Sequence, residues 1–590
     1  MAATVLLAAC VSPPRFSYVV PTQPEGASGL SEKPGWSGSK FAVTAANPLA
    51  TDAGYQVLKA GGTAVDAAVA VQMVLTLVEP QSSGIGGGAF LLHHNGKTLE
   101  AYDGRETAPA GVDEKLFLGA DGKPMGFYDA VVGGRAVGTP GTVRMLELAH
   151  REHGRIAWSK LFEPAIALAE HGFPVSARLH TLLGNEVHLK KDPIAAAYFY
   201  DAQGNAWPVG HRLKNPALAS ALRRLASEGS RALHEGEIAQ AMVSKVQGHP
   251  TNPGKLAMRD LAAYQAKKRE PFCTDYRASP PQGPNKEHRI CGMPPPSSGA
   301  IAVAQILGIL DNTIASDIPL QDGLPGAAWL HQYTEAARLA FADRALYVAD
   351  PDFVSPPAGS WRSLVDSAYL TARSSLVGTR SMKSATAGVP GPVKIAYAPM
   401  AEQPEMGTSH ISIVDGAGRS LAMTTTIEDG FGARQMVSGF LLNNELTDFS
   451  FAPTDASGQA IANRVQPGKR PRSSMSPTLV FDKATGALVM SAGSPGGAMI
   501  IHYTAKTIYG MLNWGLNAQQ AIALPNFGSL NGPTLLESKG FPEQTVDVLK
   551  ALGHEVREQP LTSGLQAIQR TPKGLFGGAD PRREGIVMGD

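Results

Sequence analysis

A glycine–threonine pair at the start of a predicted hairpin has the residue types needed for nucleophilic chemistry. Residues alternate on both sides of a glycine-rich turn, 415–418, in the stretch SHISIVDGAGRSLAMTTTI. This pattern predicts two antiparallel strands. If Val414 pairs with Ser420, Thr408 lies opposite Thr426. A register slip of one residue would still bring the end of the return strand beside Thr408.

A backbone cut between Gly407 and Thr408 would turn this hairpin into a self-contained nucleophile. The free α-amine of Thr408 could take the proton from its own hydroxyl, so no histidine base would be needed. Glycine before the cut leaves the preceding carbonyl group open to attack. The dipeptide alone does not decide the matter, because Gly-Thr also occurs elsewhere, for example at Gly62-Thr63. On periodicity alone, a plain polar hairpin is the favoured alternative.

The composition predicts a large folded protein with a small-molecule partner. Of the 590 residues, 43% are hydrophobic and 17% are charged, which is enough apolar material for a sizeable core. Lys and Arg number 52 against 51 Asp and Glu, and this balance argues against a nucleic-acid partner. The longest apolar run, 65–78, is shorter than the ~20 residues of a membrane span and contains Asp66 and Gln72. We therefore predict a buried helix there and no transmembrane segment.

The N-terminus resembles a bacterial lipoprotein signal. An apolar run in residues 1–10 ends in Leu-Ala-Ala-Cys, and residues 11–39 form a Pro-, Ser- and Gly-rich tether. Cys10 would carry the lipid, and the protein would be extracytoplasmic, either periplasmic or lipid-anchored. Nothing basic precedes the apolar run, which departs from the usual signal. A plain secretory signal and a disordered tail stay open as alternatives.

The other two cysteines lie on two predicted strands of one hairpin. Cys273 is in PFCTDYR and Cys291 is in EHRICGMP, with a Pro- and Gly-rich turn between the two segments. The pair could face each other and form a disulfide in an oxidising compartment. Two separately buried thiols are an equally good interpretation of the sequence.

The remaining pattern predicts a layered α/β protein without internal repeats. Two helices separated by Gly61-Gly62 are followed by two strands around an Asn95-Gly96 turn. Long helices follow, in TVRMLELAHREHG and WLHQYTEAARLAFADRALYVA, and strands dominate after about residue 408.

Three motifs that could indicate other functions lack the surrounding sequence that those functions require. GIGGGA at 84–89 has the spacing of a dinucleotide fingerprint, but a helix precedes it and a strand follows, so close backbone packing explains its glycines better. HEGEI and HEVRE lack the second histidine of a zinc-protease motif, and no G-x-S-x-G elbow is present. We expect no cofactor and no metal in the catalytic chemistry.

From about Lys40 to the C-terminus the chain resembles the γ-glutamyltranspeptidases, a family of the N-terminal-nucleophile hydrolase superfamily. The ordered motifs that carry the resemblance include SSGIGGGAF, DGRETAPA, MPPPSSGAIAVAQIL, FADRALYVADPDFV, GTSH, LLNNELTDF, KRPRSSMSPT and GSPGG. The resemblance implies a four-layer αββα sandwich with two stacked mixed sheets between helical layers. It also implies self-cleavage at Gly407-Thr408 into a large chain, 40–407, and a small catalytic chain, 408–590, which stay together as an αβ heterodimer.

The same resemblance assigns roles to individual residues. Thr408 would be the nucleophile, oriented by Thr426, and the backbone N–H groups of Gly496 and Gly497 would form the oxyanion hole. A clamp would hold the amino-acid head group of the substrate. Its carboxylate would meet Arg105, Ser473 and Ser474, and its ammonium group would meet Glu445, Asp448 and Glu428. Part of the family has asparagine in place of Glu428, so we expect altered contact geometry there.

The implied reaction is two-step acyl transfer. Thr408 takes the γ-glutamyl group from glutathione or another γ-glutamyl amide and passes it to water, an amino acid or a dipeptide. A related acylase acting on a glutaryl side chain or a polyglutamate is the alternative, and a non-catalytic, lipid-anchored binding protein is a more remote one. The segment 449–472, which covers the pocket in some members, is shortened here and holds no tyrosine. We therefore predict a more open pocket.

Overall fold

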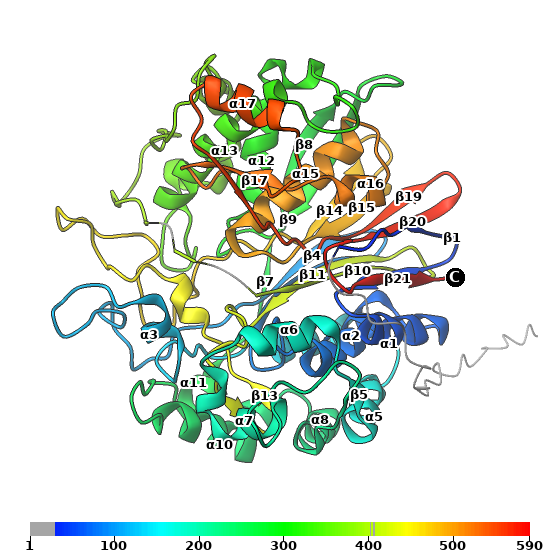
Figure 1. The fold of residues 1–590 in the computed structure, drawn as a ribbon, viewed down its shortest axis with the longest axis vertical. Helices are drawn as coiled ribbons and strands as arrows, with labels where there is room; N and C mark the ends of the chain where they lie inside the picture. Colours follow the sequence, from blue (N-terminus) through cyan, green and yellow to red (C-terminus); the bar gives the residue numbers. More distant parts are fainter. Residues whose placement is uncertain (1–29, 402, 405–406) are drawn as a thin grey trace, which may run out of the picture.

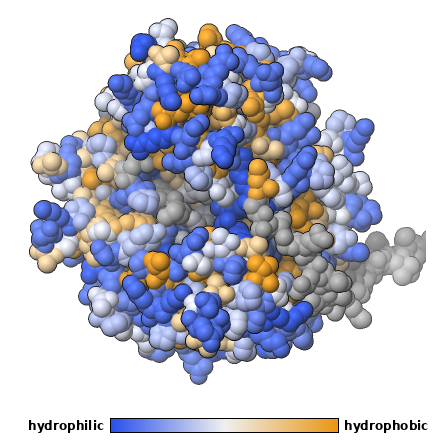
Figure 2. All heavy atoms as spheres, viewed as in Figure 1, coloured by the Kyte–Doolittle hydropathy of each residue, from blue (hydrophilic) through white to orange (hydrophobic). Residues whose placement is uncertain are grey.

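The computed structural model describes residues 30–401, 403–404 and 407–590. The predicted signal segment, Cys10 and most of the predicted tether lie outside the described residues. None of the described helices is both long enough and apolar enough to cross a membrane. Hydrophilic side chains cover much of the face seen in Figure 2, and hydrophobic ones are scattered among them.

Two seven-stranded sheets are stacked at the centre of the molecule (Figure 1). The first sheet runs, in spatial order, β21 (Ile586–Gly589), β2 (Ala42–Ala45), β10 (Ser409–Val414), β11 (Ser420–Thr426), β3 (Gly88–His94), β4 (Leu99–Gly104) and β7 (Lys267–Arg269). The second runs β1 (Trp36–Gly38), β20 (Gly574–Ala579), β19 (Gln566–Thr571), β15 (Leu488–Gly493), β14 (Thr478–Asp482), β9 (Lys286–Gly292) and β8 (Phe272–Ala278).

The neighbouring strands of both large sheets pair antiparallel, so the expectation of mixed sheets was wrong on this point. The physical reason is local. Pairs such as β10–β11 and β3–β4 are joined by short turns, which only antiparallel strands allow. Smaller sheets comprise β5 (Phe173–Pro174) with β6 (Arg212–Leu213), β12 (Met436–Val437) with β13 (Phe440–Leu441), and β16 (Phe527–Gly528), β17 (Thr534–Glu537) and β18 (Val556–Gln559).

Helical layers cover the outer faces of both sheets, so the predicted four-layer αββα arrangement is confirmed (Figure 1). On the first sheet lie α1 (Pro48–Lys59) and α2 (Ala64–Val78), with α3 (Phe127–Val131), α4 (Thr142–His153), α5 (Glu163–His171), α6 (Ala177–Asn185), α7 (Pro193–Phe199), α8 (Pro216–Glu228), α9 (Arg231–His234), α10 (Gly236–Gln247) and α11 (Met258–Ala263) on the same side. On the second lie α12 (Gly299–Asp311), α13 (Ala327–Tyr347), α14 (Ser367–Ser374), α15 (Ile500–Leu512), α16 (Ala518–Ala523) and α17 (Glu543–Ala551).

The two predicted helices α1 and α2 each begin at a clear local signal. Pro48 starts α1, where its missing N–H costs no hydrogen bond. Thr63 and Asp66 form a reciprocal capping box at the start of α2, which is buried along its whole length. The apolar run that is too short for a membrane span is therefore a core helix, as expected.

The register predicted for the hairpin of β10 and β11 is confirmed. Val414 pairs with Ser420, and the pairing continues to Ser409 opposite Thr425. Strand β11 ends at Thr426, which pairs with Gly88 of β3. Because the strand ends there, simple alternation does not place Glu428 as we expected.

Several polar side chains of the hairpin face the space between the two sheets. The His410 ring lies 2.9 Å from the Thr424 hydroxyl and 3.1 Å from the Ser412 hydroxyl, and Ser491 of the second sheet reaches Ser412 at 2.9 Å. Burial lowers the pKa of His410 to about 3, so this imidazole is neutral. Ser412 and Ser491 thus link the two sheets, while both nitrogens of the His410 ring are held by hydroxyls of its own hairpin and not by Thr408.

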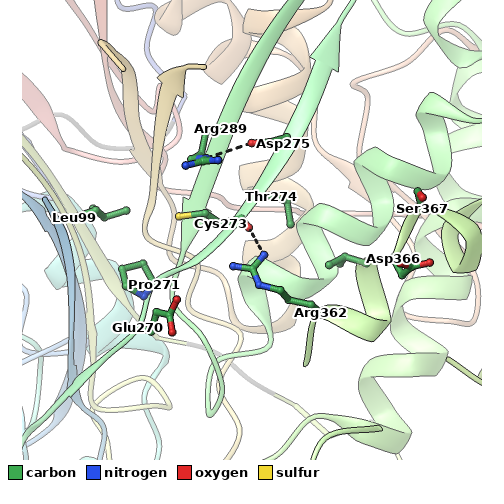
Figure 3. A pocket seen from close by; sticks show the side chains of 11 residues that line it. Leu99, Glu270, Pro271, Cys273, Thr274, Asp275, Arg289, Arg362, Asp366 and Ser367 are labelled. Atoms are coloured by element: carbon green, nitrogen blue, oxygen red, sulfur yellow. Dashed lines mark hydrogen bonds and ion pairs between the residues drawn. The ribbon is translucent and has the colours of Figure 1, made fainter. Parts of the chain in front are cut away.

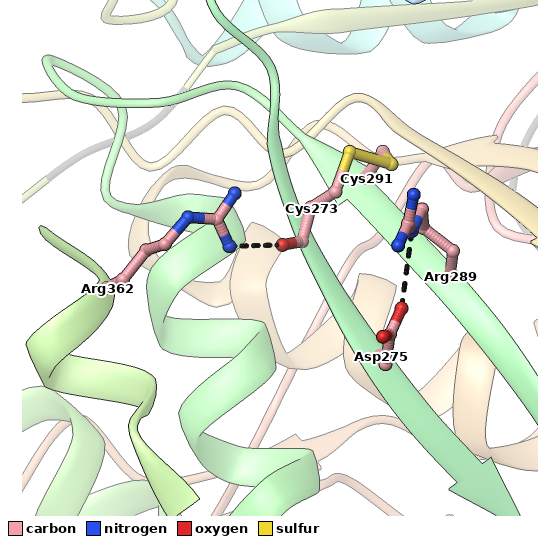
Figure 4. The surroundings of a disulfide bond; sticks show 5 residues. All are labelled: Cys273, Asp275, Arg289, Cys291 and Arg362. Atoms are coloured by element: carbon pink, nitrogen blue, oxygen red, sulfur yellow. Dashed lines mark hydrogen bonds and ion pairs between the residues drawn. A yellow bond between two sulfur atoms is a disulfide. The ribbon is translucent and has the colours of Figure 1, made fainter.

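A disulfide joins Cys273 of β8 to Cys291 of β9, which lie directly opposite in the register (Figure 4). Arg362 donates to the Cys273 carbonyl oxygen at 2.9 Å, and Arg289 pairs with Asp275 across the same two strands. Of the two interpretations left open by the sequence, the structure has the disulfide.

Candidate active site

Two threonine hydroxyls converge on one backbone carbonyl. Thr408 Oγ1 lies 2.5 Å from the carbonyl oxygen of Gly407, and Thr426 Oγ1 donates to the same oxygen at 2.7 Å. The backbone N–H of Glu428 donates to Thr426 Oγ1 at 2.8 Å and fixes its direction. Both threonines are 3% exposed. Thr426 thus contacts the carbonyl group that precedes Thr408, and its predicted role in orienting Thr408 stays a prediction.

Glycine is required at position 407 by two features of the backbone. Its φ is +65°, in the left-handed region that residues with a Cβ enter at a cost. A Cβ built there would lie 2.4 Å from the carbonyl oxygen of Glu428, which is far inside van der Waals contact. Glycine at this position therefore leaves the carbonyl group open, as expected, and also avoids a clash with Glu428.

The backbone of Gly496 and Gly497 offers two donors beside the threonines. Both residues have positive φ, +133° and +56°. They stand at the start of η7 (Gly497–Met499), which leads directly into α15. Within the described part of the chain, neither N–H donates a hydrogen bond. Free amides at a helix N-terminus suit a developing negative charge, as an oxyanion hole requires.

Arg105 lies at the centre of a buried charge cluster. Its two terminal nitrogens contact the carboxylates of Glu445 and Asp448, and its side chain also donates to the carbonyl oxygens of Pro471, at 3.1 Å, and Arg472, at 2.9 Å. The two acids sit on one turn of η6 (Glu445–Asp448), which confirms that their three-residue spacing puts both on one side. We expected Arg105 and the two acids to hold opposite charges of one ligand. In the structure they pair directly with one another.

Glu428 joins this cluster through an unusual backbone conformation. Its φ is +76°, a region that asparagine enters more readily than glutamate. Its carboxylate accepts from Asn444 Nδ2 and, at 3.2 Å, from Thr447 Oγ1. Burial, with Asp448, Asp429 and Glu445 nearby, holds its pKa well above the usual value. Glu428 does not share a strand face with Thr426 as predicted, because β11 ends at Thr426, yet the turn after β11 brings Glu428 to the site.

The two serines are held by a second layer of contacts. Ser473 Oγ accepts from the Met475 N–H at 3.1 Å, and the Ser473 carbonyl oxygen accepts from both the N–H and the hydroxyl of Ser298, each at 2.8 Å. Arg344 of α13 donates to Ser474 Oγ at 2.5 Å and to Ser298 Oγ at 2.9 Å. The conformation of KRPRSSMSPT is therefore set by residues far away in the sequence.

One small cavity of about 20 Å³ brings most of the predicted site together. Its lining comprises Arg105, Thr408, Thr426, Glu428, Glu445, Asp448, Ser473, Ser474, Met475, Gly497 and Ile500. The predicted Gly407 and Gly496 line an adjoining cavity of about 510 Å³. The carbonyl group of Gly407 therefore lies at the border of two spaces, one able to hold about a single water molecule and one of ligand size.

A further cavity, of about 650 Å³, lies elsewhere, beside the disulfide (Figure 3). Cys273, Arg289 and Arg362 are among its lining residues, and none of the predicted catalytic or clamp residues is.

Three residues of the site were missed by sequence reasoning. Arg583 is buried and donates to the Thr408 carbonyl oxygen at 3.4 Å. Glu106, next to Arg105, is buried with its pKa well above the usual value because of burial and the nearby Glu445. Arg344 fixes Ser474 as described. Arg344 lies within a family-like motif, FADRALYVADPDFV, and could have been found there, whereas nothing in the local sequence marks Arg583.

The segment 449–472 has a packed base and an exposed tip. Phe449 and Phe451 are buried in a small apolar cluster, and residues 455–459 are exposed. The cavity lining given above includes no residue of this segment. The effect of the segment on substrate access stays a prediction.

The glycine-rich stretch 84–89 packs closely, as expected. A Cβ on Gly87 would lie 2.0 Å from the Thr426 carbonyl oxygen, and one on Gly88 would lie 2.1 Å from the Glu106 carboxylate. These glycines therefore allow β3 and its neighbours to approach the catalytic hairpin.

Two antiparallel sheets between helical layers, with a threonine hydroxyl against its own preceding carbonyl group, define an N-terminal-nucleophile hydrolase. The sequence model of the family described as gamma-glutamyltranspeptidase matches residues 50–590. The chain belongs to the γ-glutamyltranspeptidase family.

Individual relatives agree with this assignment. The chain is 35% identical to the glutathione hydrolase proenzyme of Bacillus subtilis (strain 168), with 93% of this chain and 91% of the relative covered. Identity to the proenzyme of the same name from Escherichia coli (strain K12) is also 35%, covering 92% and 90%. Among solved structures, Helicobacter pylori gamma-glutamyltranspeptidase is 28% identical with a TM-score of 0.51, covering 63% of this chain and 97% of that chain. Cephalosporin acylase from Bacillus halodurans shares the fold, with a TM-score of 0.79, 24% identity and 99% of both chains covered.

Proposed function

We propose that this chain is a self-processing γ-glutamyltransferase and glutathione hydrolase. The observation that carries the proposal is the convergence of the Thr408 and Thr426 hydroxyls on the Gly407 carbonyl oxygen, beside a buried cluster of Arg105, Glu445 and Asp448. The first feature supports formation of a threonine nucleophile. The second supports recognition of an α-amino acid head group.

Self-cleavage would follow from the first feature. Thr408 Oγ1 attacks the Gly407 carbonyl carbon, and the carbonyl oxygen takes negative charge while Thr426 donates to it. The peptide C–N bond between Gly407 and Thr408 breaks, and the leaving Thr408 nitrogen takes the proton that the Thr408 hydroxyl gave up. An ester between the Gly407 carbonyl carbon and Thr408 Oγ1 remains. Water hydrolyses this ester to a Gly407 carboxylate and a free threonine hydroxyl. The new amine can then serve as the base for the next reaction.

The two resulting chains would stay together for a topological reason. The small chain supplies β10 and β11 at the middle of the first sheet and β14 and β15 at the middle of the second. Separation would break both sheets and expose the core between them.

Substrate recognition would use the charge cluster. The α-carboxylate of a γ-glutamyl compound pairs with Arg105, assisted by Ser473 and Ser474, and the α-ammonium group pairs with Glu445 and Asp448. Because these side chains now contact one another and the cavity is about 20 Å³, they must separate when a ligand enters. The γ-carbonyl carbon then meets Thr408 Oγ1, and its oxygen meets the N–H groups of Gly496 and Gly497.

The reaction would proceed by two acyl transfers. Thr408 displaces the amine of the γ-glutamyl amide, which for glutathione is cysteinylglycine, and forms an ester. Water or the amine of an amino acid or dipeptide then displaces Thr408. The cavity of about 510 Å³ next to Gly407 is a suitable path for such acceptors, since Arg178, Arg434 and Arg583 line it and could meet a carboxylate.

A glutaryl acylase is the second candidate, favoured by the fold shared with the cephalosporin acylase. A glutaryl group carries no α-ammonium group. The two buried acids beside Arg105 could receive an ammonium group, which a glutaryl chain does not offer, so the γ-glutamyl substrate is the better supported of the two.

The proposal is tested with purified protein, a Thr408→Ala variant and glutathione. We expect the wild type to yield two chains, the smaller starting at Thr408 by N-terminal sequencing, and to release glutamate, and γ-glutamyl-dipeptide when a dipeptide is added. The variant should stay whole and inactive. A folded wild-type protein that stays a single chain would overturn self-processing. A cleaved protein that hydrolyses glutaryl amides and not glutathione would support the acylase.

We further propose an extracytoplasmic location with a lipid on Cys10. The support is the apolar run of residues 1–10, the tether that follows it, and the Cys273–Cys291 disulfide, which fits an oxidising compartment. A Cys10→Ser variant should move from the membrane fraction to the soluble periplasmic fraction. A wild-type protein already free of lipid by mass spectrometry would contradict the anchor.

A further inference from the structure

Imidazole and carboxylate side chains gather on the helix-facing side of the first sheet, away from the active site. His93 lies on β3, Glu100 on β4, and His153 is the last residue of α4. One ligand atom from each lies within 4.8 Å of the others. His93 pairs with Leu421 and is five residues along β3 from Gly88, the partner of Thr426, so it lies about 17 Å along the sheet from the end of β11 that carries Thr426.

His93 is the side chain that the fold leaves unexplained. It is fully buried, and neither ring nitrogen has a hydrogen-bond partner among the described residues. Its ring centroid lies 4.3 Å from that of His153. An imidazole buried without a partner is costly, so such a group points to a ligand or a function.

The other members are positioned to receive a cation from solvent. His153 Nε2 lies 2.5 Å from Glu100 Oε2 and 3.8 Å from Glu152 Oε2. The side chains of His153, Glu100 and Glu152 are 15%, 21% and 31% exposed, so an ion can enter. The Lys268 ammonium group bridges the two acids at 2.8 and 2.7 Å, and its 41% exposed side chain can turn outward into water.

We propose that His93, His153 and Glu100 bind one divalent transition-metal ion of the Zn²⁺ type. Two neutral imidazoles and a carboxylate are a ligand set that Zn²⁺ accepts, with Glu152 or water in the fourth position. The ion lies between His153 Nε2 and Glu100 Oε2, and these two atoms move apart to the separation that ~2.0–2.1 Å metal bonds require.

The surroundings supply the supporting contacts of such a site. The Tyr102 hydroxyl donates to Glu152 Oε2 at 2.7 Å and lies 2.9 Å from His153 Nε2. Outer contacts of this kind orient metal ligands. Because a metal-bound nitrogen cannot also hold a hydrogen bond, Tyr102 would turn fully to the carboxylate when the ion binds.

A second grouping, His331, Glu335 and His554, carries no proposal and serves as a control. The two imidazoles contact each other at 2.7 Å, and their remaining nitrogens contact the Gly378 carbonyl oxygen and the Thr534 hydroxyl. Glu335 pairs with Arg338 at 2.6 Å. Every group there already has a protein partner, and no imidazole stands unpaired as His93 does.

The experiment is a Zn²⁺ titration by calorimetry of the full, tag-free chain after chelator treatment, repeated with Co²⁺ to record its visible absorption. We expect one ion per chain at micromolar or tighter affinity, a tetrahedral Co²⁺ spectrum, and an affinity at least tenfold lower in His93→Gln and His153→Gln. His94→Gln, which alters the neighbouring ring on Phe481, and His331→Gln should bind as the wild type does.

Each result decides the proposal. If no Zn²⁺ binds, the proposal is overturned. If several ions bind weakly, and equally in the His93→Gln and His153→Gln variants, the result is an adventitious ion only and the proposal is also overturned. Circular dichroism checks whether each variant folds. If His93→Gln does not fold, Glu100→Gln, at a partly exposed position, should show the same loss of Zn²⁺ affinity. Retained tight binding in Glu100→Gln and His153→Gln together would also overturn it. Because self-cleavage at Thr408 is scored separately by mass, failure of the metal site does not affect the proposed activity.

Discussion

The Thr426 hydroxyl donates to the carbonyl oxygen of Gly407 at 2.7 Å, across the end of a hairpin whose register the alternation of residues predicted. That oxygen is the one that would gain charge if Thr408 attacked its own preceding peptide bond. A donor fixed in place before the reaction needs no reorganisation during it. In the proposed mechanism this one hydroxyl would stabilise self-cleavage and, afterwards, orient the freed nucleophile.

We predict that Thr426→Val slows self-cleavage about 10²–10³-fold, the usual effect of removing a donor to an oxyanion. Thr426→Ser should keep most of the rate because it keeps the hydroxyl. The appearance of the small chain is followed by gel densitometry after expression at low temperature. Equal cleavage rates for the valine and serine variants would remove Thr426 from the mechanism.

Gly407→Ala should block cleavage without unfolding the protein. A Cβ at this position would lie 2.4 Å from the Glu428 carbonyl oxygen and would favour a φ other than +65°, so the carbonyl group of residue 407 would turn away from the two hydroxyls. Gly416→Ala, in the hairpin turn, is the matched control and should cleave normally, because a Cβ at that position would meet nothing within 4 Å. Normal cleavage of Gly407→Ala would show that the strained backbone is not required.

Glu445→Gln and Asp448→Asn should weaken binding of γ-glutamyl substrates by about 10–150-fold in KM, equivalent to about 1.5–3 kcal/mol for a lost charged hydrogen bond. The corresponding glutaryl amide, which lacks the ammonium group, should lose far less. Steady-state kinetics with both substrates gives the comparison, and thermal unfolding checks that the loss of a partner for Arg105 has not unfolded the site. Equal losses on both substrates would mean that these acids only hold Arg105.

Glu428 should make stability fall as the pH rises. Its pKa is raised above the usual 4.5 in the folded chain, so above about pH 4.5 the folded state holds a proton that the unfolded state has released. The free energy of unfolding therefore decreases from about pH 4.5 through the folded pKa. In Glu428→Gln the free energy of unfolding should change less with pH, so the Tm of this variant should rise relative to that of the wild type as the pH increases. Glu555→Gln, a substitution at an exposed position, is the control. A Tm difference that is constant with pH would contradict the prediction.

Removal of the disulfide should destabilise the protein by about 3 kcal/mol, the loop-closure value for the 18 residues that separate its cysteines. Urea unfolding of Cys273→Ser with Cys291→Ser is compared with the wild type, with and without a reducing agent. Reduced wild type should match the double variant. No change on reduction would show that the bond is not formed in the purified protein.

The sequence by itself determined the local features of this protein. The alternation around residues 415–418 fixed the hairpin and its register, because the side chains of a strand point to opposite faces with a period of two. The three-residue spacing of Glu445 and Asp448 put both acids on one turn, since each helical turn spans about three residues. The ordered motifs indicated the family and most of the candidate site.

Only the tertiary structure decided what depends on contacts between distant segments. It brought Arg105 against Glu445 and Asp448, placed Arg583 at the Thr408 carbonyl oxygen, and made the large sheets antiparallel. It also put Glu428 in the site through a left-handed turn that strand alternation could not foresee. Periodicity reports which face a residue occupies, whereas the partner it meets there depends on how the sheets and helices pack.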